Sequence, residues 1–211
     1  MNTPKKILLV LGNVNKKIVI TSVEDTYVIQ SSPTLNVHTS ATLALRVSAT
    51  AQRHPILKFD LSTIPANSKI ISAILNLYTN TVPVGANNTL TVYPILVANS
   101  DMVFTEMAWN IRKTDTAWAG DTGGDGGADG GCFVSGTDYD STSIGSCVFP
   151  TGAVQGTRLI CLLNKDTVQG WLTNNYGIII LPSSTETMAL FSVNNVDGNA
   201  IYRPTLEITY K

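Results

Sequence analysis

The sequence has few charged residues and almost no excess of either sign. Charged side chains make up 14% of the 211 residues, about half the usual share, and 14 basic residues face 15 acidic ones for a net charge of -1. A protein that follows a phosphate backbone needs a basic patch or stripe. The composition therefore argues against nucleic acid as a partner.

Long hydrophobic runs are also lacking, although a helix needs about 20 apolar residues to cross a membrane. The apolar run nearest the N-terminus consists of Ile7, Leu8, Leu9, Val10 and Leu11. This run follows two lysines, as in a secretory signal, but it stops at Gly12 and no small-residue cleavage site comes after it. We expect neither a signal peptide nor a membrane as partner, and we expect synthesis in the cytosol.

Catalytic motifs are missing as well. The only histidines are His38 and His54, and neither comes with the spacing of a nucleophile and its base. We expect His54 to be a half-exposed residue at a strand edge and His38 to lie in a polar loop. Carboxylates such as Asp138 and Asp140 are pairs by sequence only, which is weak support for glycoside hydrolysis. The sequence predicts a protein that is not an enzyme.

The three cysteines leave at least one thiol unpaired within the chain. Cys161 stands in an apolar segment and is interpreted as a small buried hydrophobic residue. Cys132 and Cys147 flank a polar loop, and a disulfide between them would contribute roughly 3 kcal/mol on the chain-entropy model. Two free thiols are the alternative if the protein stays in a reducing compartment.

What the sequence does contain is a series of short alternating segments broken by turn residues, without a long stretch of helical period. Residues 69–78 come close to alternating between apolar and polar side chains, as a strand with one buried face does. Residues 166–173 could form a helical turn capped by Asp166. The pattern predicts an all-β protein, an antiparallel β-sandwich of the jelly-roll type, folded as one domain.

A polar insertion at about residues 119–147 interrupts this pattern. Its glycine-rich part, residues 121–131, cannot pack a core, and we expect a solvated loop whose deletion leaves the sandwich folded. Asp121, Asp125 and Asp129 recur in it every four residues. Carboxylates are calcium ligands, but this spacing matches neither the EF-hand loop nor the nine-residue calcium repeat, so a bound structural calcium ion is the weaker interpretation and no cofactor is the stronger one.

Several segments resemble the DNRLRE-type β-sandwich domain. They include residues 25–28, the block Leu57-Lys58-Phe59-Asp60-Leu61-Ser62, the segment 104–110 with Trp118, and the closing residues 203–210. The resemblance covers about residues 23–211 and implies a jelly roll of two antiparallel sheets. Such domains occur in carbohydrate-binding modules of secreted enzymes and in phage virion proteins. The pattern of residues 108–118 looks most like the virion members.

Residues 1–22 precede this resemblance and are interpreted as an N-terminal arm or hairpin. A strand built from Ile7–Leu11 shows apolar side chains on both faces, so one face would need a neighbour. We therefore expect an assembly arm that binds a second copy of the protein or the surface it decorates. The alternative is an extra strand buried within its own domain.

Together these features favour a non-catalytic component of a phage virion surface, made in the host cytoplasm, whose partners are other virion proteins or further copies of itself. The alternative is an extracellular carbohydrate-binding module of a polysaccharide-degrading system. Either could present a glycan-binding surface, since sugars pack on exposed rings and bond to planar polar groups. The residues expected to form it are Trp118, Tyr139, Arg46 and Lys58, whereas Trp109 and Trp171 are interpreted as packing residues.

Overall fold

A computed structural model describes residues 14–82, 85–123, 127–195 and 200–211. The strands are β1 (Lys16–Ile29), β2 (Thr42–Leu45), β3 (Arg53–Phe59), β4 (Ile70–Thr81), β5 (Asn88–Pro94), β6 (Ile111–Lys113), β7 (Thr116–Ala117), β8 (Gly145–Phe149), β9 (Arg158–Leu163), β10 (Ile178–Pro182), β11 (Met188–Phe191) and β12 (Thr205–Tyr210). The helices are η1 (Val97–Asn99), α1 (Lys165–Gly170) and η2 (Ala200–Tyr202). None of these helices is long and apolar enough to span a membrane.

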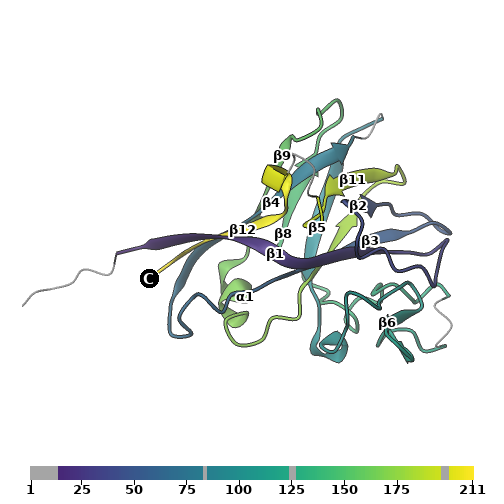
Figure 1. Cartoon of the computed structure of the whole chain (residues 1–211), viewed down its shortest axis with the longest axis horizontal. Coiled ribbons are helices and arrows are strands. Elements are labelled where there is room, and N and C mark those ends of the chain that lie inside the picture. The colour runs from purple at the N-terminus through teal and green to yellow at the C-terminus, as the bar shows by residue number, and fades with distance from the viewer. Residues whose placement is uncertain (1–13, 83–84, 124–126, 196–199) are drawn as a thin grey trace, which may run out of the picture.

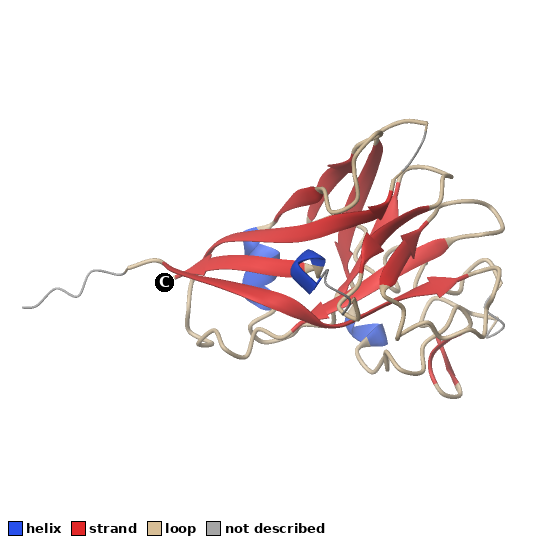
Figure 2. Ribbon diagram, turned by 45° about the horizontal axis from the view of Figure 1, so that its top comes forward, coloured by secondary structure: helices blue, strands red, loops and turns tan. Residues whose placement is uncertain are grey.

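Ten strands form two antiparallel layers that share β1, and β6 and β7 pair separately as a two-stranded sheet (Figures 1 and 2). The first half of β1 pairs with β12, which continues to β4 and β9, and β11 and β2 extend this first sheet. The second half of β1 pairs with β3, which continues to β10, β5 and β8 in a second sheet. The antiparallel β-sandwich that the sequence predicts is confirmed.

The main hydrophobic core lies between the two sheets, and β9 shows how an alternating strand contributes to it. In β9, Leu159, Cys161 and Leu163 are buried while the residues between them are exposed. Such alternation is expected of a strand with one face in the core and one face in solvent. The helical turn expected near residues 166–173 is present as α1, with Asn164 rather than Asp166 as its N-cap.

A second hydrophobic core covers the outer face of the second sheet. Ile56 and Ile179 contribute to it from the sheet, and Trp109, Trp118 and Tyr139 contribute from the chain between β5 and β8. The glycine-rich insertion is therefore not merely a solvated loop. Asp121 near its start and Gly131 at its end are buried, and the indole of Trp109 donates a hydrogen bond to the carbonyl of Gly127. These contacts argue against the expectation that deletion of the glycine-rich part leaves the sandwich folded, and that expectation stays a prediction.

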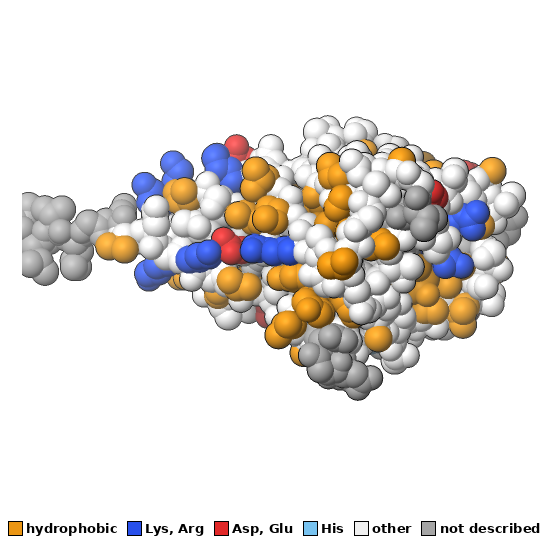
Figure 3. All heavy atoms as spheres, turned by 90° about the horizontal axis from the view of Figure 1, so that it is seen from above, with side chains coloured by type: hydrophobic (Ala, Val, Ile, Leu, Met, Phe, Trp, Pro, Cys, Tyr) orange, Lys and Arg blue, Asp and Glu red, His pale blue; other side chains and the backbone are white. Residues whose placement is uncertain are grey.

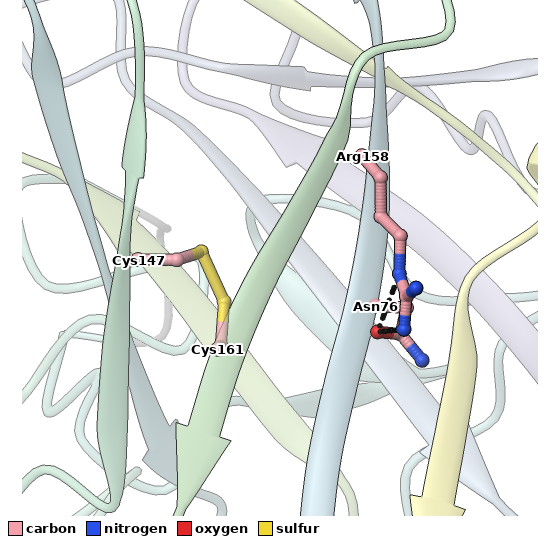
Figure 4. Close-up of a disulfide and its surroundings, with 4 residues drawn as sticks. All are labelled: Asn76, Cys147, Arg158 and Cys161. Atoms are coloured by element: carbon pink, nitrogen blue, oxygen red, sulfur yellow. Dashed lines mark hydrogen bonds between the residues drawn. A yellow bond between two sulfur atoms is a disulfide. The ribbon is translucent and has the colours of Figure 1, made fainter.

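One disulfide is present among the described residues, and it joins Cys147 to Cys161 rather than to Cys132. Cys147 and Cys161 point into the main core from β8 and β9, the outermost strands of the two sheets, and their Cα atoms are 4.7 Å apart (Figure 4). Cys132 lies in the second core, on the other face of the second sheet, and stays free. Both the Cys132–Cys147 pairing and the view of Cys161 as an unbridged residue are wrong, because position along the chain does not show which sheet edges meet.

The boundary expected after residue 22 falls inside β1. Residues 16–21 pair with residues 205–210 of β12, so this part of the expected arm is a strand of the sandwich. The start of β1 consequently lies beside the C-terminus (Figure 1). The proposed assembly arm, Ile7–Leu11, lies outside the described residues, and its role stays a prediction.

The disulfide should contribute measurably to stability because it joins the two sheets at the edge opposite β1. Its loss in a Cys147→Ser/Cys161→Ser variant should lower the free energy of unfolding by about 3 kcal/mol and the melting temperature by roughly 6–12 °C. Calorimetry with and without a reductant measures the effect. The double variant is also the control for the reductant. It has no disulfide to reduce, so reductant should leave its melting temperature unchanged. An unchanged melting temperature in reduced wild-type protein would contradict the bridge.

Gly131 should tolerate no side chain because its backbone lies against the ring of Trp109. It has φ +71°, and an added Cβ would lie 2.4 Å from the ring carbons Cε3 and Cζ3. Gly136 is a matched control, with φ +79° and nothing within 4 Å of an added Cβ. Chemical denaturation should show Gly131→Ala to be less stable than Gly136→Ala by about 1–3 kcal/mol. Equal stabilities would mean that the insertion does not pack on Trp109.

Candidate functional site

A cleft of about 520 Å³ opens at the end of the second sheet, within the roughly 300–1,000 Å³ usual for ligand sites. It forms where β1 leaves β3: the ladder ends at the pair Ser22 and Phe59, with a bulge between Ser22 and Glu24. Beyond Phe59 the chain turns away, so the two strands diverge. The lining residues are Val23, Glu24, Lys58, Phe59, Asp60, Leu61, Ser62, Trp171, Leu172, Thr173 and Asn175.

The wall formed by residues 171–175 is fixed by side-chain amides. Asn175 donates to the carbonyl of Phe59 at 2.7 Å and accepts from the amide of Gly177 at 3.0 Å. Gln169 in α1 donates to the carbonyl of Ser68 at 2.9 Å and accepts from the amide of Ile70 at 2.7 Å. Both ends of the wall are thereby attached to the strands beside it. The cleft is preformed rather than dependent on a free loop.

Charged groups line the rim of the cleft. Glu24 and Lys58 are opposite each other in the ladder between β1 and β3, yet neither forms an ion pair within the described part of the chain. Asp60 is exposed and accepts a hydrogen bond from the amide of Ser62 at 2.8 Å. That bond lowers the pKa of Asp60, so its carboxylate is ionised at neutral pH. An ammonium and two carboxylates are thus free to bond to a polar ligand.

Lys58 and Arg46, both expected to belong to the glycan-binding surface, lie on opposite faces. Arg46 bonds to Arg53 as an isolated antiparallel bridge, so these two side chains share a face. Arg53 and Lys58 are five residues apart on β3, and side chains an odd number of residues apart on a strand point to opposite faces. Arg46 and Lys58 therefore do not form one binding surface, and of the two only Lys58 lines the cleft.

Trp118 and Tyr139 do not form an exposed sugar platform. Trp118 is 1% exposed and donates from its indole nitrogen to the carbonyl of Ala108, and Tyr139 is 7% exposed. Both pack beneath the insertion against the second sheet. The expectation of exposure rested on their polar neighbours in sequence, and those neighbours fold back over them. Trp109 and Trp171 are buried packing residues, as expected.

The sequence interpretation missed Glu24, Asp60 and the residues beside Trp171 as members of one site. Lys58 and Asp60 belong to the Leu-Lys-Phe-Asp-Leu-Ser block, whose alternation could have indicated a shared face. Glu24 and the 171–175 segment are distant in sequence and meet the block only through the bulge in β1 and the position of α1.

The aspartates proposed as calcium ligands differ in their surroundings. Asp121 is buried and Asp129 is exposed, whereas Asp125 lies outside the described residues. Within the described ranges no three acidic, histidine or cysteine side chains gather as a metal site would require. The calcium interpretation stays a prediction.

His54 is completely buried rather than half-exposed at an edge. Its ring nitrogens lie 3.0 Å from the carbonyl oxygen of Gly131 and 2.9 Å from Oε1 of Gln52, and its ring stacks on Phe133. The side chain thus joins β3 to the insertion. Because its two polar contacts are a backbone carbonyl and an amide, the geometry gives His54 a structural role in the second core.

Comparison with known proteins adds one finding. The sequence model of carbohydrate-binding module family 96 matches residues 16–122. This segment runs from the start of β1 past β7 and contains Glu24, Lys58 and Asp60. No curated protein matches the chain.

The buried state of His54 should make stability depend on pH. Burial lowers the pKa of His54 from 6.5 to about 4, against the weaker effect of the Gly131 carbonyl. Between these values the unfolded chain binds a proton that the folded chain does not, so the free energy of unfolding should fall as pH falls from about 6.5 to 4. The largest decrease in the free energy of unfolding from this cause is about 3 kcal/mol.

Urea denaturation between pH 7 and pH 4 measures this dependence in wild type and in His54→Gln. The variant should have the flatter profile. Burial raises the pKa of Asp25, which acts in the opposite direction in both proteins, so their difference isolates His54. Parallel profiles would show that His54 is protonated in the folded protein.

Proposed function

Because the chain belongs to carbohydrate-binding module family 96, we propose that it binds polysaccharide without cleaving it and that the cleft at the end of the second sheet is its sugar-binding site. The observation that carries this assignment is the combination of an apolar floor with unpaired charged groups. Trp171 and Leu172 line the floor, while Glu24 and Lys58 stand at the rim without ion-pair partners in the described chain.

This combination suits a sugar, whose C–H face packs on apolar side chains and whose hydroxyls exchange hydrogen bonds with charged and amide groups. Carboxylates accept from hydroxyl protons and the lysine ammonium donates to hydroxyl oxygens. The fixed wall at residues 171–175 lowers the entropy lost on binding, because little of the cleft has to become ordered.

An extracellular location is part of this proposal. Disulfides persist in oxidising compartments and are rare in reducing ones, and Cys147–Cys161 joins the two sheets. A place on a virion surface, favoured by the pattern of residues 108–118, stays a prediction. It is compatible with glycan binding, because a particle that attaches to cell-surface polysaccharide could use the same cleft.

Binding assays on a panel of polysaccharides test the proposal, with affinity electrophoresis to find ligands and calorimetry to measure dissociation constants. Lys58→Ala and Glu24→Ala should each raise the dissociation constant about tenfold or more, equivalent to about 1.4 kcal/mol, with little change in melting temperature. Lys16→Ala removes the same charge from the exposed start of β1 and should bind as wild type does.

Loss of binding in the Lys16→Ala control would mean that general charge, not the cleft, holds the ligand. If wild type binds no member of a panel that covers neutral, carboxylated and sulfated chains, the proposed function is wrong. Product release from any polysaccharide, abolished by Glu24→Ala or Asp60→Asn, would replace the binding role by an enzymatic one.

A further inference from the structure

The outer face of the first sheet carries a second group of side chains with the chemistry of a sugar site. Tyr78 of β4 and Arg158 of β9 are opposite each other in the antiparallel ladder. Their side chains leave the same face of the sheet, while the adjacent residues Leu77 and Leu159 are buried in the main core. None of these side chains lines the cleft, which opens at the end of the second sheet.

Arg158 is held in place by a neutral partner. Its Nε and Nη2 donate to Oδ1 of Asn76 at 3.0 and 2.7 Å, across the ladder between β9 and β4 (Figure 4). Asn76, which is 3% exposed, donates in turn to the hydroxyl of Thr205 at 3.2 Å. The two bonds to Asn76 fix the orientation of the guanidinium. A guanidinium has five N–H groups, so its other donors remain available to a ligand, because the Arg158 side chain is exposed. Arg158 forms no ion pair in the described chain.

Two tyrosine rings form the neighbouring part of this face. The rings of Tyr78 and Tyr202 have centroids 5.6 Å apart, and Tyr202 stacks on Phe191 at 5.2 Å. An added Cβ at Gly156 would lie 2.7 Å from the Tyr202 ring, so the missing side chain there is what admits the ring. Both tyrosines are half-buried, which leaves part of each ring open to a ligand.

Apolar side chains extend the face along β9. Ile160 is 52% exposed and Leu162 is 68% exposed, both on the side of Arg158. Elsewhere on the face Lys17 and Glu207 form an ion pair at 2.8 Å and so neutralise each other. In the view from above, basic side chains gather towards the end where the termini lie, and the rest of that surface is mainly hydrophobic and uncharged (Figure 3).

We propose that this face, made by Tyr78, Tyr202 and Arg158 and continued by Ile160 and Leu162, is a second polysaccharide-binding surface, and that it takes a neutral chain of pyranose sugars. The proposal rests on the proposed function and goes beyond it, because one module then contacts two chains at once. The rings and methyl groups pack on sugar C–H faces, and the oriented guanidinium donates to ring hydroxyls. A polyanionic chain would call for more than one uncompensated basic group.

The experiment compares single and combined variants of the two surfaces on the full chain. Wild type, Lys58→Ala, Arg158→Ala and the double variant are tested for binding to a neutral polymer, such as cellulose or mannan, and to a carboxylated polymer in parallel. Arg158→Ala should weaken binding to the neutral polymer about tenfold, Lys58→Ala should leave residual binding, and the double variant should lose it. Ile160→Thr provides a second test that leaves the Arg158–Asn76 bond in place, and it should weaken the same binding.

Several outcomes would contradict the second surface or its neutral ligand. Neutral-polymer binding at wild-type strength in both Arg158→Ala and Ile160→Thr would overturn the second surface while leaving the cleft intact. An effect seen only with the carboxylated polymer would overturn the neutral ligand. If sedimentation shows a dimer that Leu162→Ser converts to a monomer without any effect on binding, the face joins two copies instead. Failure of wild type to bind any polymer would remove both proposals.

Discussion

Strand β1 determines the geometry of the molecule because it belongs to both sheets. Its first half pairs with β12 and its second half with β3, and the bulge between Ser22 and Glu24 marks the change. Asp25 is completely buried beside the bulge, where it accepts from the hydroxyl of Ser192 at 2.7 Å and the amide of Val193 at 2.8 Å. Burial raises the pKa of Asp25 and these two donors oppose the rise. The network ties the bulge to the chain after β11, and the diverging strands leave the cleft beside it.

The opposite side of the sandwich is closed covalently. Cys147 and Cys161 join β8 to β9, so each sheet is connected to the other at both margins, through β1 on one side and through the disulfide on the other. A sandwich held in this way cannot open by sliding one sheet over the other without breaking one connection. The faces and the end cleft therefore keep their shape, which lowers the ordering cost of binding an extended polymer.

The sequence predicted the β-sandwich but not which residues pack against each face of its sheets. Alternation in residues 69–78 depends only on neighbouring positions, which is why that strand and the fold class could be read from it. The burial of Trp118 depends on how the insertion folds onto the second sheet, and the pairing of Cys161 depends on which sheet edges meet. Both are set by contacts between residues far apart in the sequence. In the candidate site, Lys58 was predicted and Glu24 was not, because the bulge in β1 brings Glu24 opposite Lys58.

The covering of one sheet explains why the two proposed surfaces lie where they do. Residues between β5 and β8 place Trp109 and Trp118 on the outer face of the second sheet, and the cleft lies beyond that core at the end of the sheet. In the described chain no comparable layer covers β9, where Ile160 and Leu162 stay exposed. The first sheet thus presents an aromatic and apolar area with the cation of Arg158, while the cleft holds the charges of Glu24 and Lys58. A flat face suits contact along a polymer, and a charged cleft suits recognition of individual sugar units.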